Sequence, residues 1–218
     1  MSATRLGIYN GALKLCGERK LASLTENREP RQLLDDVWSD DGVKACLEAG
    51  QWFFAMRTQA VDYEPSIEPA FGYRRAFTKP TDWCLTSAVC EDEYFRVPLT
   101  QHTDEAGYWF ADRDQIFVKY VSNDDDYGGS LARWPQAFVN YVESYFASKI
   151  CRKLTSAADI VDALLHPRTG LVASARLAAQ NANAMALPTK FPAQGTWVRA
   201  RRGQRRQRDG GNTGQLIG

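Results

Sequence analysis

The chain contains two histidines, which come first in a search for catalysis because a serine, threonine or cysteine nucleophile needs a base within reach. His102 falls in a segment expected to be a loop, and His166 directly precedes Pro167. Neither lies in a recognisable hydrolase or metal-binding motif, and the sequence has neither a Walker-type phosphate loop nor a G-x-G-x-x-G run. We therefore expect surface or capping roles for both histidines, with no catalytic and no cofactor-binding residues.

Two acidic runs have the residue types for cation binding or acid–base chemistry. The run Asp124-Asp125-Asp126, followed by Gly128, is similar to part of a calcium loop, but the glutamate that would complete such a site is missing at the required spacing. The run Glu91-Asp92-Glu93 precedes an expected strand, where neighbouring side chains alternate between faces and rarely act together. We expect a solvated acidic loop and an exposed turn, and no metal site.

The most specific polar feature is the C-terminal segment. Residues 190–218 carry seven cations and one anion, so this segment is +6; because the whole chain is +1, residues 1–189 are −5. The cations are Lys190, Arg199, Arg201, Arg202, Arg205, Arg206 and Arg208. Such a segment binds an acidic protein surface or nucleic acid, or is only solvated. No aromatic residue lies between Arg199 and Arg208, so base stacking there is not indicated, and we favour a protein partner.

Length and composition are those of a soluble globular protein. At 218 residues, with 44% apolar and 24% charged residues, the chain suffices for one large domain or a domain with a substantial insertion. No apolar run approaches the roughly 20 residues that cross a bilayer. The first residues lead into a helical pattern instead of a signal peptide. We expect a protein that is made in the cytoplasm and has no membrane partner.

The five cysteines are odd in number, far apart and without a C-x-x-C pair, so neither a disulfide scaffold nor a zinc site is indicated. They are Cys16, Cys46, Cys84, Cys90 and Cys151. Three of them fall on apolar stripes at helical spacing, where a free cysteine behaves as a small hydrophobic residue. We expect reduced core residues.

Apolar residues at intervals of three and four predict several helices. One spans residues 5–16, with a C-terminus at Gly17. A second runs from Pro30 to about residue 49 or 50, with Gly42 able to loosen its middle. A third begins at Trp134-Pro135, and its apolar face consists of Phe138, Tyr141, Val142, Tyr145, Phe146, Ile150 and Leu154. An alanine-rich helical region follows from about 157 to 186, with a break at Pro167 and Gly170.

The middle of the chain has β character. Residues 51–61 fit either a short helix or an extended segment. Prolines, turn residues and short β-like runs then predict a small antiparallel sheet between about 62 and 130. Its expected strands are 94–97 and 115–121, with 108–110 pairing with the latter across a turn at 111–114. The fold class is therefore α+β.

These elements predict one helical bundle made of distant segments. Its first part is 1–61 and its second part is 131–187, with the β-rich insert at 62–130 between them. Residues 188–218 lose the periodicity and read as an extended basic C-terminal arm without a core of its own.

Three patterns in the first 90 residues together resemble the tail tubular protein A family, the head-to-tail adaptors (connectors) of short-tailed bacteriophages. The first pattern is Ala12, Leu13, Cys16, Gly17, Glu18, Leu21, Ser23 and Leu24; the second is Trp52, Phe54, Ala55 and Arg57; the third is Tyr73, Ala76, Phe77, Pro80, Asp82 and Leu85. The helical segments after residue 134 are loosely similar as well. Each motif taken alone fits an ordinary helix end, aromatic core or turn.

The resemblance implies a virion protein of the phage neck or tail, made in the host cytoplasm, that forms a homo-oligomeric ring of twelve copies. Its partners would be the portal protein and a downstream tail or nozzle protein, with transient passage of genomic DNA. On this hypothesis the arm contacts the portal or a neighbouring subunit through Arg199, Arg201, Arg202, Arg205, Arg206 and Arg208. Asp124, Asp125 and Asp126 are candidates for the lumen or rim. The arm and the Trp52-Phe53-Phe54 variation depart from the family, so the partner contacts stay open.

Two other classes remain. The alternative is a nucleic-acid-binding module that uses the arginine-rich arm as an electrostatic clamp. A small-molecule enzyme is the least favoured, because no catalytic constellation is visible.

Overall fold

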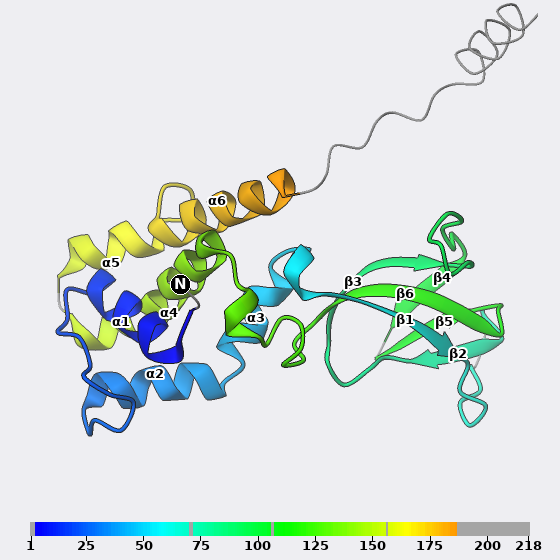
Figure 1. Cartoon of the computed structure of the whole chain (residues 1–218), viewed down its shortest axis with the longest axis horizontal. Helices are drawn as coiled ribbons and strands as arrows, with labels where there is room; N and C mark the ends of the chain where they lie inside the picture. Colours follow the sequence, from blue (N-terminus) through cyan, green and yellow to red (C-terminus); the bar gives the residue numbers. More distant parts are fainter. Residues whose placement is uncertain (1–2, 70–71, 106, 156, 187–218) are drawn as a thin grey trace, which may run out of the picture. The chain divides into compact units, whose positions relative to one another are not determined.

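A computed structural model describes residues 3–69, 72–105, 107–155 and 157–186 (Figure 1). Within these ranges the fold is mixed α and β, with six α-helices and two three-stranded antiparallel sheets. The expectation that the fold combines helices with antiparallel sheet is therefore confirmed. The arm expected at 188–218 lies outside the described residues.

Helix α1, Arg5–Leu15, has defined signals at both ends. Thr4 Oγ1 accepts a hydrogen bond from the backbone N–H of Gly7 at 3.1 Å, which satisfies one of the free donors of the first turn. At the other end Gly17 has φ 77°, and the N–H of Glu18 reaches the carbonyl of Leu13 at 2.9 Å. This is the glycine-terminated helix end that the sequence predicted.

The second expected helix is two helices. α2 spans Glu29–Ser39 and α3 spans Gly42–Glu48, because Asp41 takes a left-handed conformation with φ 58°. A Cβ at Gly42 would lie 2.5 Å from the backbone oxygen of Val37, so the chain can bend back here only where a side chain is missing. The single helix from Pro30 to residue 49 is therefore wrong in its middle.

The long helix after Pro135 is confirmed as α4, Gln136–Leu154. It contacts α1, α2 and α3 as well as the two helices that follow it, α5 (Ala158–Leu165) and α6 (Leu171–Met185). The segment between α5 and α6 contains Pro167 and Gly170, so the predicted break is confirmed. Most of the predicted apolar face of α4 is buried, but Tyr145 and Leu154 are only half-buried.

The strands form two sheets instead of one (Figure 1). In the first, β6 (Gln115–Ser122) lies between β1 (Met56–Asp62) and β3 (Trp83–Cys90). In the second, β5 (Tyr108–Ala111) lies between β2 (Arg75–Thr78) and β4 (His102–Glu105). β structure therefore starts at Met56, ahead of the expected boundary at 62, after a short 3-10 turn at Phe53–Ala55.

Two strand predictions are wrong. Residues 94–97 form a turn, in which the carboxylate of Asp92 accepts the backbone N–H groups of Arg96 and Val97 at 3.0 and 2.8 Å and Phe95 has φ 54°. Strand β5 exists, but it pairs with β2 and β4 instead of β6. The turn after β5 carries the chain from one sheet to the other, because this lets both sheets bury apolar side chains in a shared layer.

That shared layer is a small second core. It consists of residues from both sheets, Phe77, Val89, Trp109, Ala111, Ile116, Val118 and Tyr120, together with Leu99 from the segment between β3 and β4. The larger core fills the space among the helices and includes Cys84 of β3 and Val121 of β6. The first sheet, which contains β3 and β6, is thereby anchored to the helices. All five cysteines are free and buried, as expected.

Candidate functional site

The side chains of two of the resemblance motifs meet at the start of β3. Arg57 Nη1, in β1, donates to Asp82 Oδ2 at 2.9 Å. The same guanidinium lies 3.6 Å from Asp124 Oδ2 and 5.2 Å from the centre of the Tyr127 ring. Arg57 thus joins the β1 strand to the turn before β3 and to the acidic loop after β6.

Asp82 is held by more than this ion pair. The hydroxyl of Ser122 donates to its carboxylate, and Tyr120 donates to both oxygens at 3.3 Å. Burial acts to raise the pKa of Asp82, but the hydrogen bonds from Ser122 and Arg57, together with the arginine charge, outweigh it and hold the pKa below its usual value. The carboxylate is therefore an ionised structural anchor that is bound by Arg57, Ser122 and Tyr120.

The acidic loop divides into an inner and an outer part. Asp124 is half-buried, and its backbone and side-chain oxygens accept the N–H groups of Tyr127, Gly129 and Asp126 at 2.9 Å each. Asp125 and Asp126 are exposed. Of the three aspartates predicted at a lumen or rim, Asp124 thus stabilises its own loop, whereas Asp125 and Asp126 are exposed to solvent.

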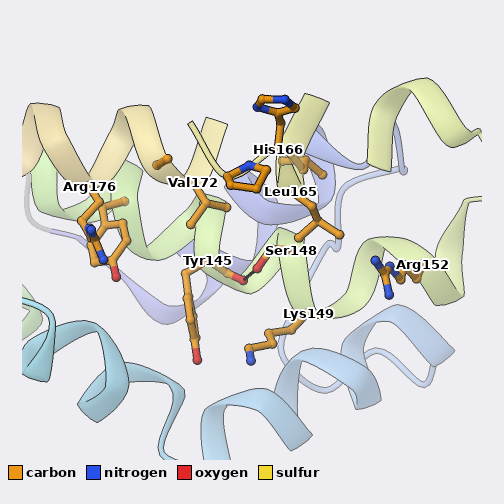
Figure 2. A pocket seen from close by; sticks show the side chains of 12 residues that line it. Tyr145, Ser148, Lys149, Arg152, Leu165, His166, Val172 and Arg176 are labelled. Carbon is orange, nitrogen blue, oxygen red and sulfur yellow. Dashed lines mark hydrogen bonds between the residues drawn. The ribbon is translucent and has the colours of Figure 1, made fainter. Parts of the chain in front are cut away.

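A cleft of about 620 Å³ lies between α4, the end of α5 and α6 (Figure 2). Tyr145, Lys149 and Arg152 follow one another along α4, at spacings of four and three residues that put them on one helix face. Arg176 of α6 and His166, at the end of α5, contribute from the other elements. The remaining lining residues are Tyr141, Ser148, Leu164, Leu165, Pro167, Val172 and Ala173.

The cleft is cationic. Lys149, Arg152 and Arg176 are exposed, and among the ion pairs of the described ranges none involves any of the three. No aspartate or glutamate lines the cleft. Lys149 Nζ lies 5.1 Å from the centre of the Tyr145 ring, an arrangement in which the ring face orients the ammonium group. The arrangement suits recognition of carboxylates or phosphates, rather than bond-making chemistry.

Sequence reasoning missed this cleft. The spacing of Tyr145, Lys149 and Arg152 is visible in the sequence, but Arg176 joins them only because α6 folds back against α4. A positive helix face on its own is an ordinary solvated surface.

The two histidines have structural roles. His102 begins β4 instead of lying in a loop, and its Nδ1 is 2.6 Å from the carbonyl oxygen of Leu99. His166 follows the last residue of α5, and its Nδ1 lies 2.8 Å from Thr169 Oγ1 and 3.1 Å from the Thr169 amide nitrogen. His166 is the C-cap of α5, one of the two roles, surface or capping, that were expected for both histidines; the loop assignment of His102 is wrong.

Across the parts of the chain that the structure covers, no three histidine, cysteine or acidic side chains come together as metal ligands. The arm arginines predicted as partner contacts, Arg199, Arg201, Arg202, Arg205, Arg206 and Arg208, lie outside the described residues. Of the helices within the described ranges, none combines the length and the apolar character needed to cross a lipid bilayer.

The sequence matches no protein-family model, and no curated protein matches it.

Proposed function

We propose that this chain is a structural subunit of a phage head-to-tail adaptor ring, which docks on the portal, continues the DNA channel and provides a platform for the tail. The observation that carries the proposal is the 2.9 Å contact between Arg57 and Asp82. The two residues belong to different motifs of the resemblance, and each motif alone is weak. Their direct pairing makes the motifs parts of one structural unit.

Two further motif residues, Trp52 and Leu21, also support the fold. Trp52 is buried, and its indole N–H donates to the carbonyl of Cys46 at 3.1 Å. Leu21 is buried, and Asn10 bonds its backbone at 2.7 and 3.2 Å. Such roles suit a subunit of an assembly, in which exposed surfaces bind the partners and the motif residues stabilise the fold.

The proposal includes a finer architecture. Residues 1–61 and 131–187, apart from strand β1, supply one helical bundle, the β-rich segment 62–130 is inserted between its two parts, and 188–218 extend as an arm to the portal or to a neighbouring subunit. A channel that passes DNA must not hold it, because several arginines gripping phosphates would slow its exit. The −5 charge of residues 1–189 suits the channel, and the +6 segment suits a protein partner.

Native mass spectrometry and particle imaging of the purified chain and of virions test the proposal. We expect a closed ring, of twelve copies if the family resemblance holds, and incorporation at the portal vertex. A persistent monomer that binds duplex DNA tightly would overturn it in favour of a nucleic-acid-binding module.

The arm has its own test. Truncation after Leu187 should leave a soluble, cooperatively melting protein that fails to join the portal, since residues 1–185 already form one compact unit. Changing Arg201, Arg202, Arg205 and Arg206 to glutamine should impair docking and leave the low DNA affinity of the ring unchanged. Tight, steeply salt-dependent DNA binding that disappears in this variant would show instead that the arm is a nucleic-acid clamp.

A further inference from the structure

The cationic cleft is built to receive an anionic partner group. Lys149 and Arg152 of α4 and Arg176 of α6 surround a hollow of about 620 Å³ without a lining carboxylate (Figure 2). Because these cations have no anionic partner among the described residues, an external anion gains their attraction without first breaking an ion pair.

Apolar and aromatic side chains also line the cleft. Tyr141 and Leu164 are buried, and Val172 and Leu165 are half-buried. An occupant therefore meets apolar side chains next to exposed cations, a combination also found at protein interfaces, where apolar contacts exclude water and charges set orientation and specificity.

Charge decides the nature of the occupant. The chain's own C-terminal segment is +6, so the three cations repel it. The rest of the chain is −5, so a second copy of this protein offers the complementary sign. A ring subunit in particular needs two different faces that fit each other, one on each side.

The acidic loop after β6 is the part of a second copy that fits. It carries three consecutive aspartates, of which Asp125 and Asp126 are exposed. Asp124 holds the loop in shape through its contacts with Arg57 and with the N–H groups of Tyr127 and Gly129. A loop that is already ordered loses little conformational entropy when it binds.

We infer that the α4–α6 cleft is one half of a subunit interface, and that it receives Asp125 and Asp126 of a second copy of the chain. Lys149, Arg152 and Arg176 bind the two carboxylates. The inference rests on the proposed ring and gives it a contact: the loop lies at the boundary between subunits instead of in the lumen.

Charge reversal with compensation tests this pairing. Lys149→Glu/Arg152→Glu and Asp125→Lys/Asp126→Lys are each expected to weaken self-association at least tenfold in sedimentation velocity. The quadruple variant, which restores opposite charges at these four positions and leaves only Arg176 unchanged, is expected to recover most of the loss. Thermal melts of each variant separate a lost interface from a lost fold.

Matched controls use charges that are equally exposed but lie elsewhere. Lys153→Glu/Arg168→Glu changes two cations beside the cleft that do not line it, and Glu93→Lys/Glu105→Lys changes two carboxylates of the β region. Both are expected to self-associate like the unaltered chain.

The outcomes separate this inference from the adaptor proposal. If the protein self-associates and the cleft reversal has no larger effect than its control, or if the quadruple variant shows no recovery, the pairing is wrong and the adaptor proposal is untouched. A chain that does not self-associate at all overturns the pairing as well.

If the pairing is confirmed but virions carry no such ring at the portal, the adaptor proposal fails alone. Duplex DNA binding that is lost on cleft reversal, with self-association unchanged, would make the cleft a nucleic-acid site.

Discussion

Arg57 and Asp82 are 25 residues apart in the chain, and their side chains meet at 2.9 Å, where the first sheet joins the helical part of the fold. Ser122 and Tyr120 reach the same carboxylate from β6. One ionised group thus holds β1, the turn before β3 and the end of β6 together.

Replacing Asp82 with asparagine keeps the shape and removes the charge that Arg57 faces. We expect Asp82→Asn to lower the free energy of unfolding by about 1–3 kcal/mol at neutral pH, the usual cost of depriving a buried polar group of its partner. Urea denaturation measures it. Asp126→Asn, in the exposed part of the acidic loop, is the control and should be neutral.

The same variant has a defined pH dependence. The pKa of Asp82 is lower in the folded protein than its ordinary value of 3.8, so its charge stabilises the fold above that value. The stabilisation declines as the pH falls from 3.8 through the folded pKa. The difference between the unaltered chain and Asp82→Asn should therefore shrink in acid, and a difference that stays constant would show that the carboxylate is not the source of the stability.

Phe146 lies at the centre of the helical core. It is fully buried, and its ring is 5.9 Å from that of Trp38 in α2 and 6.5 Å from that of Tyr9 in α1. Phe146→Ala should cost about 3–5 kcal/mol through lost contacts and the cavity left behind. A thermal melt compares it with Leu177→Ala, an exposed α6 residue expected to be nearly neutral. An unchanged melt of Phe146→Ala would contradict the packing of α4 on α1 and α2.

Glu143 is a carboxylate that the fold half-buries. It packs on Gly11, where a Cβ would lie 2.4 Å from its oxygens. Burial raises the pKa of Glu143 above 4.5, although the charge of Lys14 opposes this. Because the folded state then holds the proton more tightly than the unfolded state, ionisation costs stability at neutral pH, and the cost disappears below pH 4.5.

Glu143→Gln should therefore raise the melting temperature at neutral pH, by up to about 2–4 °C, the shift that 1 kcal/mol produces in a domain of this size. The gain should vanish below the ordinary glutamate pKa. Glu48→Gln, on the exposed side of α3, is the control. An equal gain at acidic and neutral pH would rule out the carboxylate charge as the cause.

The buried thiols should be chemically inert in the native protein. Burial raises the pKa of Cys16 and Cys46 to about 12 and that of Cys84 to about 11. At mildly alkaline pH few thiolates are present and reagents cannot reach them. We expect iodoacetamide to modify almost none of the five cysteines in buffer and all five in urea, as read by mass spectrometry. Rapid native labelling of Cys16 or Cys46 would show that the helical core opens.

The sequence by itself determined the local features. The helix at 5–16, its end at Gly17, the long helix after Pro135, the break near Pro167 and the strand 115–121 all follow from periodicity and from the backbone limits of glycine and proline. The burial of Cys16, Cys46 and Cys151 follows from their places on apolar stripes at helical spacing. These signals involve residues within about two turns or one strand of each other, so a sequence pattern can carry them.

Tertiary structure decided the rest. Asp41 splits α2 from α3 because the chain turns back to pack on α4. β5 pairs with β2 and β4 in a second sheet instead of with β6, because two sheets that face each other bury Trp109 and Ile116 together. The pairing of Arg57 with Asp82 and the meeting of Arg152 with Arg176 at one cleft join residues far apart in the sequence. No local pattern encodes such meetings, because they depend on the burial of apolar surface by the whole fold, which sets the elements side by side.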